Sequence, residues 1–489
     1  MILPEASALI GEQKNVYKLE VRRPILVKGS AGSGKTLVAV HRACHLYSMA
    51  TGRSGGVSQA QLALDEVSKG DRIGFFTFDT SLRDEVAEHF KHKNIPVQVT
   101  NIDSWCYNFL KARGLNPRRA LTDTTVEKEC LSSAKTKAFS GILGNPAILS
   151  KSDDFYFDEY EWIKGQCIAT VEDYIQARRK GRGTADRLKE TDRRLLWKLK
   201  LALDEELARR GLETFRDRVL RALESLDEKP LSEAEQFDHI IVDEAQDFTL
   251  ARLRLIARLA KGKAPEEKSI SLFADSGQCI YESGTSWKEA GLAVVGRTYE
   301  FKHNYRNTVQ IARAAQSLLA QEPDQSDLVA SELPTREGPQ PRLVCGSESH
   351  ALTELLHVLQ DIPASETCAI GVTSNRLRKE LLEKLGAQGF ETINPGLCRA
   401  KPGENGSPLI YIRTLHKLKG LQFDHVILWR LCDGTFPRWQ DKDTDYSKFR
   451  KLLYVAMTRA CKTLTIICPG DPSPLIKEID PNLLVHCHV

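Results

Sequence analysis

An eight-residue run near the start of the sequence constrains this chain more than any other feature. The run consists of Gly29, Ser30, Ala31, Gly32, Ser33, Gly34, Lys35 and Thr36, which fits the pattern G-x-x-x-x-G-K-[ST]. Apolar residues 25–27 precede it as a strand pattern, and residues 37–44 follow it with helical spacing. In that context, glycines let backbone N–H groups surround phosphates at the positive end of a helix. The run predicts a phosphate-binding loop, in which Lys35 would reach the β and γ phosphates and Thr36 would bind Mg²⁺.

Such a loop needs a carboxylate at the end of a neighbouring strand to hold its metal ion. Asp243 and Glu244 follow the apolar residues 240–242, at the point where a buried strand would emerge. Asp243 would hold Mg²⁺, and Glu244 would take the proton from the attacking water. A solvated acidic strand end is the alternative, and the phosphate loop makes it the lesser one. The two motifs together predict ATP hydrolysis.

Short apolar runs of strand length recur along the chain and alternate with helical patterns. They lie at residues 25–27, 73–76, 239–242, 270–273, 368–372, 409–412, 426–429 and 464–468. From about residue 111 to residue 236 the strand signals thin out, and charged helical segments dominate. A polar stretch at about 321–341 indicates a linker or surface loop. The pattern predicts an α/β fold with parallel sheets and one mainly helical insertion.

Composition adds little to this prediction. The chain has 489 residues, of which 41% are hydrophobic and 27% charged, as expected of a globular protein with two or three domains. Its net charge of +4 neither requires nor excludes nucleic acid. We expect no membrane span and no secretory signal, because the apolar runs are short and residues 1–5 lack the signal layout. Twelve scattered cysteines without a Cys-x-x-Cys pair favour reduced thiols in the cytoplasm.

Further segments resemble, in order, the motifs of superfamily 1 DNA helicases of the UvrD/PcrA/Rep type. Residues 243–247 (DEAQD) resemble the second motif, and residues 275–281 (DSGQCIY) resemble the third. The fourth, fifth and sixth are matched by residues 304–308 (NYRNT), 414–424 (TLHKLKGLQFD) and 453–460 (LYVAMTRA). The resemblance extends over nearly the whole chain apart from the segment before residue 236. It implies two RecA-like motor domains with parallel sheets, the cofactors ATP and Mg²⁺, and DNA as the track.

The resemblance also assigns further residues to the nucleotide. These are Gln13 for the adenine, Tyr305 for stacking on the base, Gln278 for the water or γ phosphate, Arg306 and Arg459 as arginine fingers from the second motor domain, Lys419 and Gly420 near the phosphates, and Gln422 near the sugar. For Gln13 an ordinary surface glutamine is the alternative. For the two arginines the lesser alternative is a surface ion pair. A finger of this kind contributes about 10³–10⁵ in rate.

Strand-contacting positions follow from the same resemblance. They are Thr77, Phe78 and Trp105 in the first motor domain and Asn375, Thr414 and His416 in the second. Aromatic platforms suit this role, because each stacked base contributes about 1–3 kcal/mol. For Phe78 and Trp105 the alternative is packing in the core, where most aromatic side chains lie.

Three positions depart from the family pattern. Asp103 stands where many relatives have histidine, and this weakens the expected strand contact next to Trp105. Gln422 replaces a glutamate that relatives use at the nucleotide sugar, so the nucleotide preference is open. After Tyr281 the expected Trp-Arg-Gly is missing, and Trp287 is the nearest aromatic residue. Whether Trp287 supplies the missing stacking platform is left open by the sequence.

The motifs divide the chain into expected domains. Residues 1–110 and 237–307 would form the first motor domain, 111–236 the helical insertion, and 308–489 the second motor domain. About a hundred residues separate motifs four and five, too few for the large accessory domain that bigger relatives carry there. The leading prediction is a helicase or translocase moving 3′ to 5′ on single-stranded DNA or a partial duplex. The alternative is a DNA-stimulated ATPase that regulates or loads a partner nuclease in DNA repair or phage defence and unwinds little alone.

Overall fold

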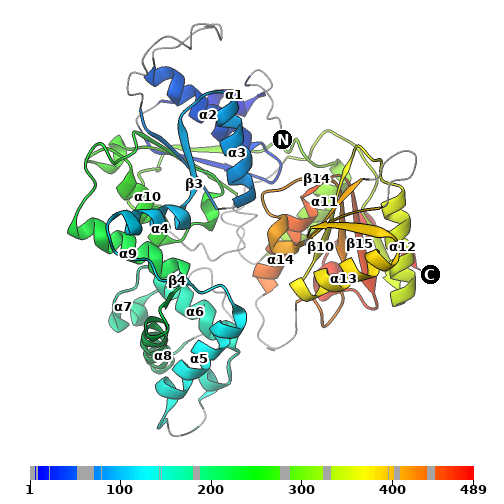
Figure 1. Ribbon diagram of the computed structural model, residues 1–489. Coiled ribbons are helices and arrows are strands. Elements are labelled where there is room, and N and C mark those ends of the chain that lie inside the picture. The colour runs from blue at the N-terminus through cyan, green and yellow to red at the C-terminus, as the bar shows by residue number, and fades with distance from the viewer. Residues whose placement is uncertain are drawn as a thin grey trace. The chain divides into compact units, whose positions relative to one another are not determined.

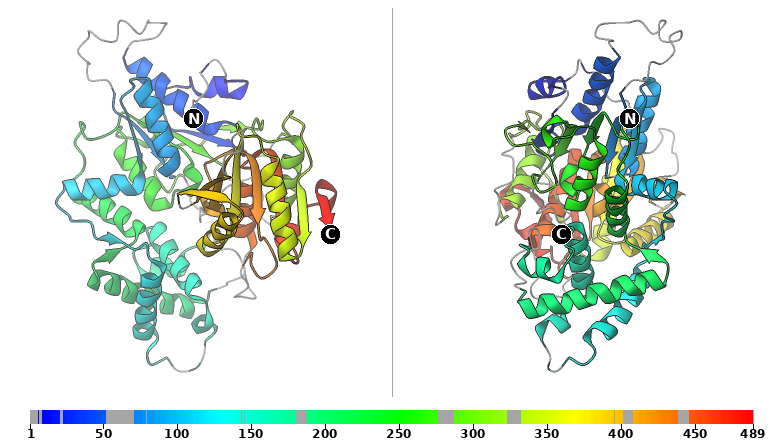
Figure 2. Two further views of the ribbon diagram at one scale, coloured as in Figure 1. Left: turned by 45° about the vertical axis from the view of Figure 1, so that its right-hand side comes forward. Right: turned by 90° about the vertical axis from the view of Figure 1, so that its left-hand side faces the viewer.

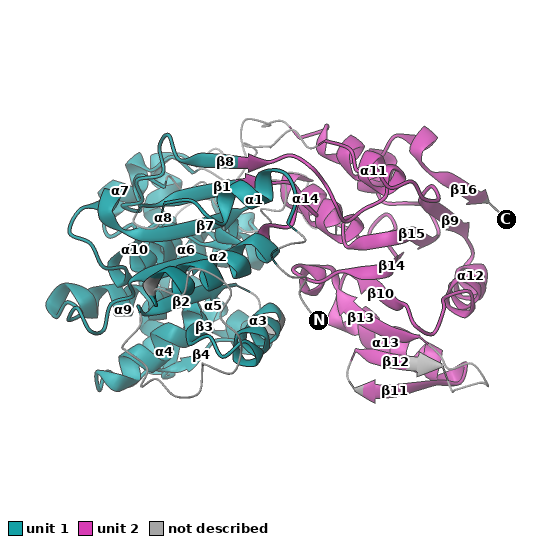
Figure 3. Cartoon of the chain, turned by 90° about the horizontal axis from the view of Figure 1, so that it is seen from above, with its two compact units in different colours: residues 1–27, 36–274, 281–299 teal, residues 28–35, 275–280, 300–489 magenta. Residues whose placement is uncertain are grey.

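The computed structural model describes residues 6, 9–20, 23–51, 71–78, 80–142, 144, 146–179, 188–275, 287–322, 332–394, 396–400, 408–437 and 446–488. The chain forms two compact units, coloured separately in Figure 3. The first consists of residues 1–27, 36–274 and 281–299, and the second of residues 28–35, 275–280 and 300–489. The phosphate loop therefore groups with the second unit, although the strand before it and the helix after it belong mainly to the first.

A six-stranded sheet with the order β3-β2-β6-β7-β1-β8 forms the centre of the first unit (Figure 1). Its strands are β1 (Ile25–Gly29), β2 (Ile73–Thr77), β3 (Val97–Asn101), β6 (His239–Val242), β7 (Ser269–Ala274) and β8 (Thr298–Phe301). The pairs β2–β3, β2–β6 and β6–β7 are parallel. Strands β2, β6 and β7 are buried along their whole length, as expected of a parallel sheet covered on both faces.

Helices of the first unit both cover this sheet and form a separate cluster. They are α1 (Glu12–Val16), α2 (Lys35–Ala50), α3 (Thr80–His92), α4 (Ile102–Ala112), α5 (Thr124–Phe139), α6 (Asp153–Gly165), α7 (Val171–Gln176), α8 (Glu190–Arg209), α9 (Phe215–Glu228) and α10 (Leu250–Leu259). Helices α4, α9 and α10 share a core with β6 and β7. Helices α5 to α8 pack around a core of their own, and Figure 2 shows these helices at one end of the unit. Two short parallel strands, β4 (Arg119–Ala120) and β5 (Leu212–Glu213), lie beside this cluster.

The second unit contains an eight-stranded sheet with the order β11-β12-β13-β10-β14-β15-β9-β16. Its strands are β9 (Arg342–Gly346), β10 (Thr367–Val372), β11 (Phe390–Asn394), β12 (Leu397–Ala400), β13 (Leu409–Thr414), β14 (Phe423–Trp429), β15 (Ala460–Pro469) and β16 (Val485–His488). The pairs β13–β10, β10–β14, β14–β15, β15–β9 and β9–β16 are parallel, whereas β11–β12 and β12–β13 are antiparallel. The helices are α11 (Val309–Leu319), α12 (Glu348–Gln360), α13 (Asn375–Ala387), α14 (Tyr446–Met457) and α15 (Pro474–Lys477).

The α/β class with parallel sheets and a helical insertion, predicted from the sequence, is confirmed. All eight predicted strands are present, each within one residue or a few of its expected bounds. Several strands were not predicted, among them β3, β9 and β16. The compact units divide the chain after residue 299 and place residues 28–35 with the second unit, which differs from the expected division after residue 307. Over the described ranges, no helix combines the length and the apolar character needed to cross a membrane.

Candidate nucleotide and strand-binding site

The phosphate loop is folded as tightly as its glycines allow. Gly32 and Gly34 adopt φ values of +78° and +81°, which L side chains rarely take up. A Cβ at Gly29 would lie 2.5 Å from Ser33 Oγ, and the Ser33 hydroxyl donates to Ser30 O over 2.8 Å. The Ser30 hydroxyl is buried and has no hydrogen-bond partner among the described residues. The loop thus combines a hydroxyl group that lacks a partner among the described residues with two glycines in the left-handed conformation, so the residues present fit a bound nucleotide.

Lys35 opens α2 and its ammonium group is almost fully buried. Its Nζ donates to Gly29 O over 2.7 Å and to Ser30 O over 2.8 Å, and it lies 3.2 Å from Asp275 Oδ2. Asp275 follows β7 directly and is 2% exposed. A buried ammonium of this kind is stable because it is paired and hydrogen-bonded. The bonds to Gly29 O and Ser30 O hold the Lys35 side chain against the phosphate loop, where it is predicted to bind the phosphates.

Thr36 and Asp243 lie together, as a metal site would need. Thr36 Oγ1 donates to Asp243 Oδ2 over 2.7 Å, and Asp243, 1% exposed, follows β6. A hydroxyl and a carboxylate are hard oxygen ligands of the type that Mg²⁺ prefers, with phosphate oxygens and waters as its other ligands. The pair therefore fits Mg²⁺.

Glu244 is held in a backbone conformation that is unusual for its residue type. Its φ of +52° and ψ of +41° are left-handed, and its N–H donates to Asp243 Oδ1 over 3.0 Å. Gln246 donates through its side-chain amide to the Glu244 carboxylate. Non-glycine residues in this region cost about 1–3 kcal/mol and cluster at functional sites. The left-handed backbone turns Glu244 away from the direction of the strand, and the hydrogen bond from Gln246 holds its carboxylate in place.

Residues of the fourth motif contact the phosphate loop within the second unit. Tyr305 N–H donates to Gly32 O over 3.0 Å, and a Cβ at Gly32 would lie 2.3 Å from Asn304 Oδ1. Asn304 Oδ1 in turn accepts from the backbone N–H of Arg306 over 2.9 Å. Tyr305 is 45% exposed, and a partly exposed aromatic ring is the kind of side chain on which a base could stack. Nη1 of Arg306 is buried and has no hydrogen-bond partner in the described part of the chain.

Segments 304–308 and 453–460 are tied together by Asn307. Its side-chain amide donates to Thr458 O over 3.1 Å and to Ala460 O over 2.6 Å. Arg459 lies between those carbonyls in sequence and is 1% exposed, with Nε donating to Val455 O over 3.0 Å and Nη1 to Leu421 O over 3.3 Å. Because Arg459 is buried, it does not fit the surface position considered as the alternative for it.

The remaining predicted nucleotide residues fall in different surroundings. Gln13 is 5% exposed and its Oε1 accepts from the Ile10 N–H over 3.1 Å, so it is not an ordinary surface glutamine. Lys419 is buried and Gly420 has a φ of +79°, whereas Gln422 is exposed. Gln278 lies outside the described residues.

Two predicted strand contacts lie beyond the carboxyl ends of β2 and β3, which are parallel neighbours. Phe78 and Trp105 are both half-buried and pack against the core of the first unit. Each therefore takes part in core packing and is also partly exposed, as a strand contact would have to be. Thr77 is 0% exposed, which keeps its side chain from the surface. Asp103 forms a salt bridge with Arg252 at 2.8 Å, and the Arg252 guanidinium lies 5.3 Å from the centre of the Phe78 ring.

The other three predicted strand contacts lie at the carboxyl ends of β10 and β13, where Val372 pairs with Thr414. Asn375 is exposed at the first turn of α13, and Thr414 is half-buried. Part of His416 faces solvent, but desolvation of its ring, with repulsion from Lys448 and Lys419, lowers the pKa of its imidazole to about 4. The ring is therefore neutral at pH 7 and offers stacking or a hydrogen bond rather than a charge.

Sequence reasoning missed several residues of this region. Asp275 ends the apolar run of β7 just as Asp243 ends that of β6, and this parallel could have revealed it. Asn304 and Asn307 lie within the fourth motif, but their roles were not predicted, because their hydrogen bonds depend on the folded arrangement. Tyr454 is also buried, and burial together with the nearby Asp275 raises the pKa of its phenol above the ordinary value.

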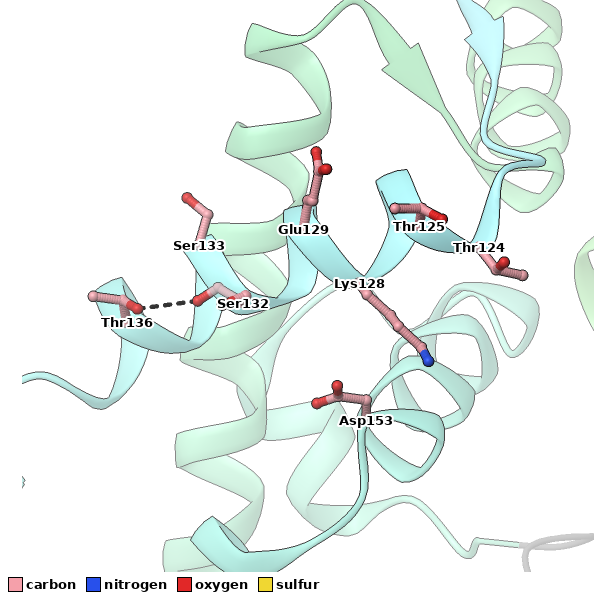
Figure 4. A pocket seen from close by; sticks show the side chains of 8 residues that line it. All are labelled: Thr124, Thr125, Lys128, Glu129, Ser132, Ser133, Thr136 and Asp153. Atoms are coloured by element: carbon pink, nitrogen blue, oxygen red, sulfur yellow. Dashed lines mark hydrogen bonds between the residues drawn. The ribbon is translucent and has the colours of Figure 1, made fainter. Parts of the chain in front are cut away.

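An open polar hollow on the helical insertion lies apart from all of these residues. Its volume is about 690 Å³ (Figure 4). Its lining consists of Thr124, Thr125, Lys128, Glu129, Ser132, Ser133 and Thr136 from α5 and Asp153 from α6. No predicted nucleotide or strand residue lines it.

Comparison with known proteins yields matches of limited length. PcrA, an ATP-dependent DNA helicase of Leuconostoc citreum, is 36% identical over 95 residues, which cover 17% of this chain and 13% of PcrA. The ATP-dependent DNA helicase UvrD1 of Mycobacterium leprae is 29% identical over 147 residues, 27% of this chain and 17% of UvrD1. A solved C-terminal domain of a possible DNA helicase from Lactobacillus plantarum is 23% identical and covers 37% of this chain and 98% of that one. Its TM-score of 0.28 is too low to bear on the fold.

Two families match the chain over longer stretches. Residues 9–297, more than half of the chain, match the UvrD/REP helicase N-terminal domain. Residues 397–469 match the UvrD-like helicase C-terminal domain. The two α/β sheets are accordingly those of RecA-like motor domains, with the helical cluster as an insertion in the first. The chain belongs to the UvrD/REP helicase family.

Proposed function

We propose that the protein is an ATP-dependent DNA helicase or translocase that moves 3′ to 5′ along single-stranded DNA. The observation that carries this proposal is the phosphate loop and the two carboxylates that contact it. Lys35 forms a salt bridge with Asp275, and the Thr36 hydroxyl donates a hydrogen bond to Asp243. Family membership supports DNA as the track. The matched segments span 13% and 17% of the PcrA and UvrD1 relatives, so the activity of the whole chain is our inference.

Each residue of the proposed site has one task. The loop N–H groups and Lys35 hold the phosphates, and Thr36 and Asp243 hold Mg²⁺. When bound, Mg²⁺ neutralises charge on the phosphate oxygens. Glu244 accepts the proton of the attacking water. Further contributions come from Arg306 and Arg459 as positive charge, Tyr305 and Gln13 at the base, Gln278 at the water, Lys419 and Gly420 near the phosphates, and Gln422 at the sugar.

The track would be gripped at the carboxyl ends of the strands, where open α/β sheets bind their ligands. Phe78 and Trp105 are half-buried, so part of each residue remains exposed to solvent, where we expect bases to bind. Asn375, Thr414 and the neutral His416 would contact the strand from the second sheet. Phosphate contacts make such binding fall steeply with salt concentration.

Stimulated ATP hydrolysis is the first test. Single-stranded DNA should raise the rate of ATP hydrolysis by the purified protein, and a lack of stimulation by any strand would remove the motor proposal. Glu244→Gln should still bind ATP but lose turnover by roughly 10²–10⁴-fold, the range of general-base catalysis. Glu266→Gln is the matched control, because Glu266 is exposed and lies outside every motif. Normal turnover of Glu244→Gln would exclude Glu244 as the general base.

A second candidate function is a DNA-stimulated ATPase that regulates or loads a partner nuclease. The observation that favours it lies between motifs four and five. There the described residues 308–322, 332–394, 396–400 and 408–414 are all used by α11 to β13 and their short connections, so this part of the chain holds no further domain. A duplex with a 3′ overhang separates the two candidates. Strand separation supports the helicase, whereas ATP use without separation supports the regulatory ATPase.

A further inference from the structure

Two exposed aromatic rings flank one arginine on the surface of the first unit. Tyr107 of α4 is 39% exposed and Phe215 of α9 is 38% exposed. The guanidinium carbon of Arg218 lies 5.2 Å from the centre of the Tyr107 ring and 5.7 Å from that of Phe215. Helices α4 and α9 pack together (Figure 1). Because cation–π contacts hold both rings, neither ring has to be ordered when a ligand arrives.

A buried carboxylate fixes this arrangement. Glu213 is 1% exposed, and it accepts from Arg218 Nε over 2.8 Å and from Arg221 Nη1 over 2.6 Å. The same two arginines donate to the loop that joins α4 to β4. Arg218 Nη2 lies 3.2 Å from Arg118 O, and Arg221 Nη2 lies 2.5 Å from Leu115 O. The rings and this loop therefore form one rigid surface.

The loop adds positive charge to the rings. Residues 111–119 contain four basic residues and no acidic one. Lys111 lies one helical turn after Tyr107 on α4, and Lys111, Arg118 and Arg119 are all exposed. None of these three makes a salt bridge with another described residue. We call Tyr107, Phe215, Lys111, Arg118 and Arg119 the α4–α9 patch.

We propose that the α4–α9 patch is a second binding surface for single-stranded DNA. This deepens, and rests on, the proposed function on DNA. Flat rings held beside exposed cations suit unpaired bases and their phosphates, whereas the bases of a duplex are stacked on one another and cannot reach such rings. The patch differs from the predicted contact at Trp105. The Trp105 ring stacks on Phe109 at 4.8 Å and packs against the core, whereas Tyr107, two residues on, faces outward.

Binding of a labelled 40-residue oligothymidylate to the full chain, without nucleotide, tests the proposal. Tyr107→Ala/Phe215→Ala should weaken binding about tenfold or more, as expected from the loss of stacked bases. Tyr107→Phe should bind like the wild type, because the ring is kept. Arg118→Ala/Arg119→Ala should lower the slope of log K against log salt by about 1.4, that is, about 0.7 for each lost phosphate contact on a single strand. A purely structural role would not change that slope.

Matched controls lie on α8, away from the patch. Leu201→Ala removes an exposed apolar side chain, and Arg194→Ala removes an exposed arginine. Both should bind like the wild type. Wild-type binding and salt slope in the patch variants would overturn the proposal. So would patch variants that lose affinity for polyglutamate while they keep affinity for the oligothymidylate, because the ligand would then be an acidic peptide. If single-stranded DNA does not stimulate ATP hydrolysis by the wild type, but the patch variants still bind the oligothymidylate more weakly than the wild type, only the proposed function is removed.

Discussion

Gly32 shows how much a single residue of the phosphate loop is constrained. Its φ of +78° would strain any other residue, and Asn304 Oδ1 and Arg306 Cβ would lie 2.3 Å and 2.7 Å from an added Cβ. A Cβ at position 32 would therefore cost free energy twice, once through backbone strain and once through collision with the neighbouring side chains. Because Tyr305 also binds Gly32 O, a displaced Gly32 would disturb the fourth motif as well.

Gly32→Ala should abolish measurable nucleotide binding or weaken it at least tenfold. Backbone strain alone costs about 1–3 kcal/mol, and the collision adds to it. Gly211→Ala is the matched control, because Gly211 has a φ of +66° but nothing within 4 Å of its added Cβ. It should lower thermal stability slightly and leave nucleotide affinity unchanged. Titration with a fluorescent ATP analogue checks both variants, and equal affinities would show that the collision does not matter.

Local patterns predicted single residues well where the chemistry depends on a strand end. Asp243 lies beside Thr36 because one follows β6 and the other opens the helix after β1. Burial was harder to predict. Thr77 and Arg459 are named by short motifs, yet both are almost completely buried, since burial depends on neighbours that are distant in sequence. The catalytic and binding roles themselves remain predictions.

At the scale of elements, α5 and α6 of the insertion bring like charges together. Burial raises the pKa of Glu127 on α5 to about 7, with added repulsion from Asp154, Glu161 and Asp158 of α6. A carboxyl group whose folded pKa is above its ordinary 4.5 favours folding only while it is protonated. Its effect on stability is therefore most favourable below pH 4.5, is lost as the pH rises toward 7, and is fully lost above 7.

Glu127→Gln should protect α5 and α6 at pH 8 and change little at pH 4.5. Because Glu127 is half-exposed, we expect a gain of about 1 kcal/mol rather than the full effect of the shift. Amide exchange in these helices, followed by mass spectrometry, should slow about fivefold at pH 8 relative to the wild type. Glu172→Gln, at an exposed position of α7, is the control and should change exchange at neither pH. If the ratio of the exchange rates of variant and wild type were the same at pH 8 and pH 4.5, Glu127 would not be the group responsible for the pH dependence.

The more deeply a strand is buried, the more clearly the sequence predicted it. Strands β2, β6 and β7 are buried throughout and consist largely of apolar residues, so their runs are plain in the sequence. Strand β3 is half-buried to exposed and reads VQVTN, and β16 reads VHCH at a sheet edge. Edge strands need apolar residues on one face at most, so their pattern merges with that of loops.

At the scale of the whole molecule, each of the two sheets carries predicted strand-contacting residues at the carboxyl ends of its strands. Phe78 and Trp105 follow strands of the first sheet, and Asn375, Thr414 and His416 follow strands of the second. The two sets differ in chemistry, because the first is aromatic and the second is polar. A DNA strand has a direction, so if both sets contact the strand as we propose, the protein should step in one direction only.

Translocation should therefore displace streptavidin from one end of a biotinylated oligonucleotide. The family resemblance implies 3′ to 5′ movement, so ATP should speed release from a 5′ biotin and leave a 3′ biotin unaffected. Glu244→Gln should release neither, because grip without hydrolysis gives no net movement. Phe78→Ala should slow 5′ release by weakening the grip, while Leu201→Ala should not. Faster release from the 3′ end would reverse the proposed polarity, and equal ATP-independent release from both ends would contradict directional movement by this chain.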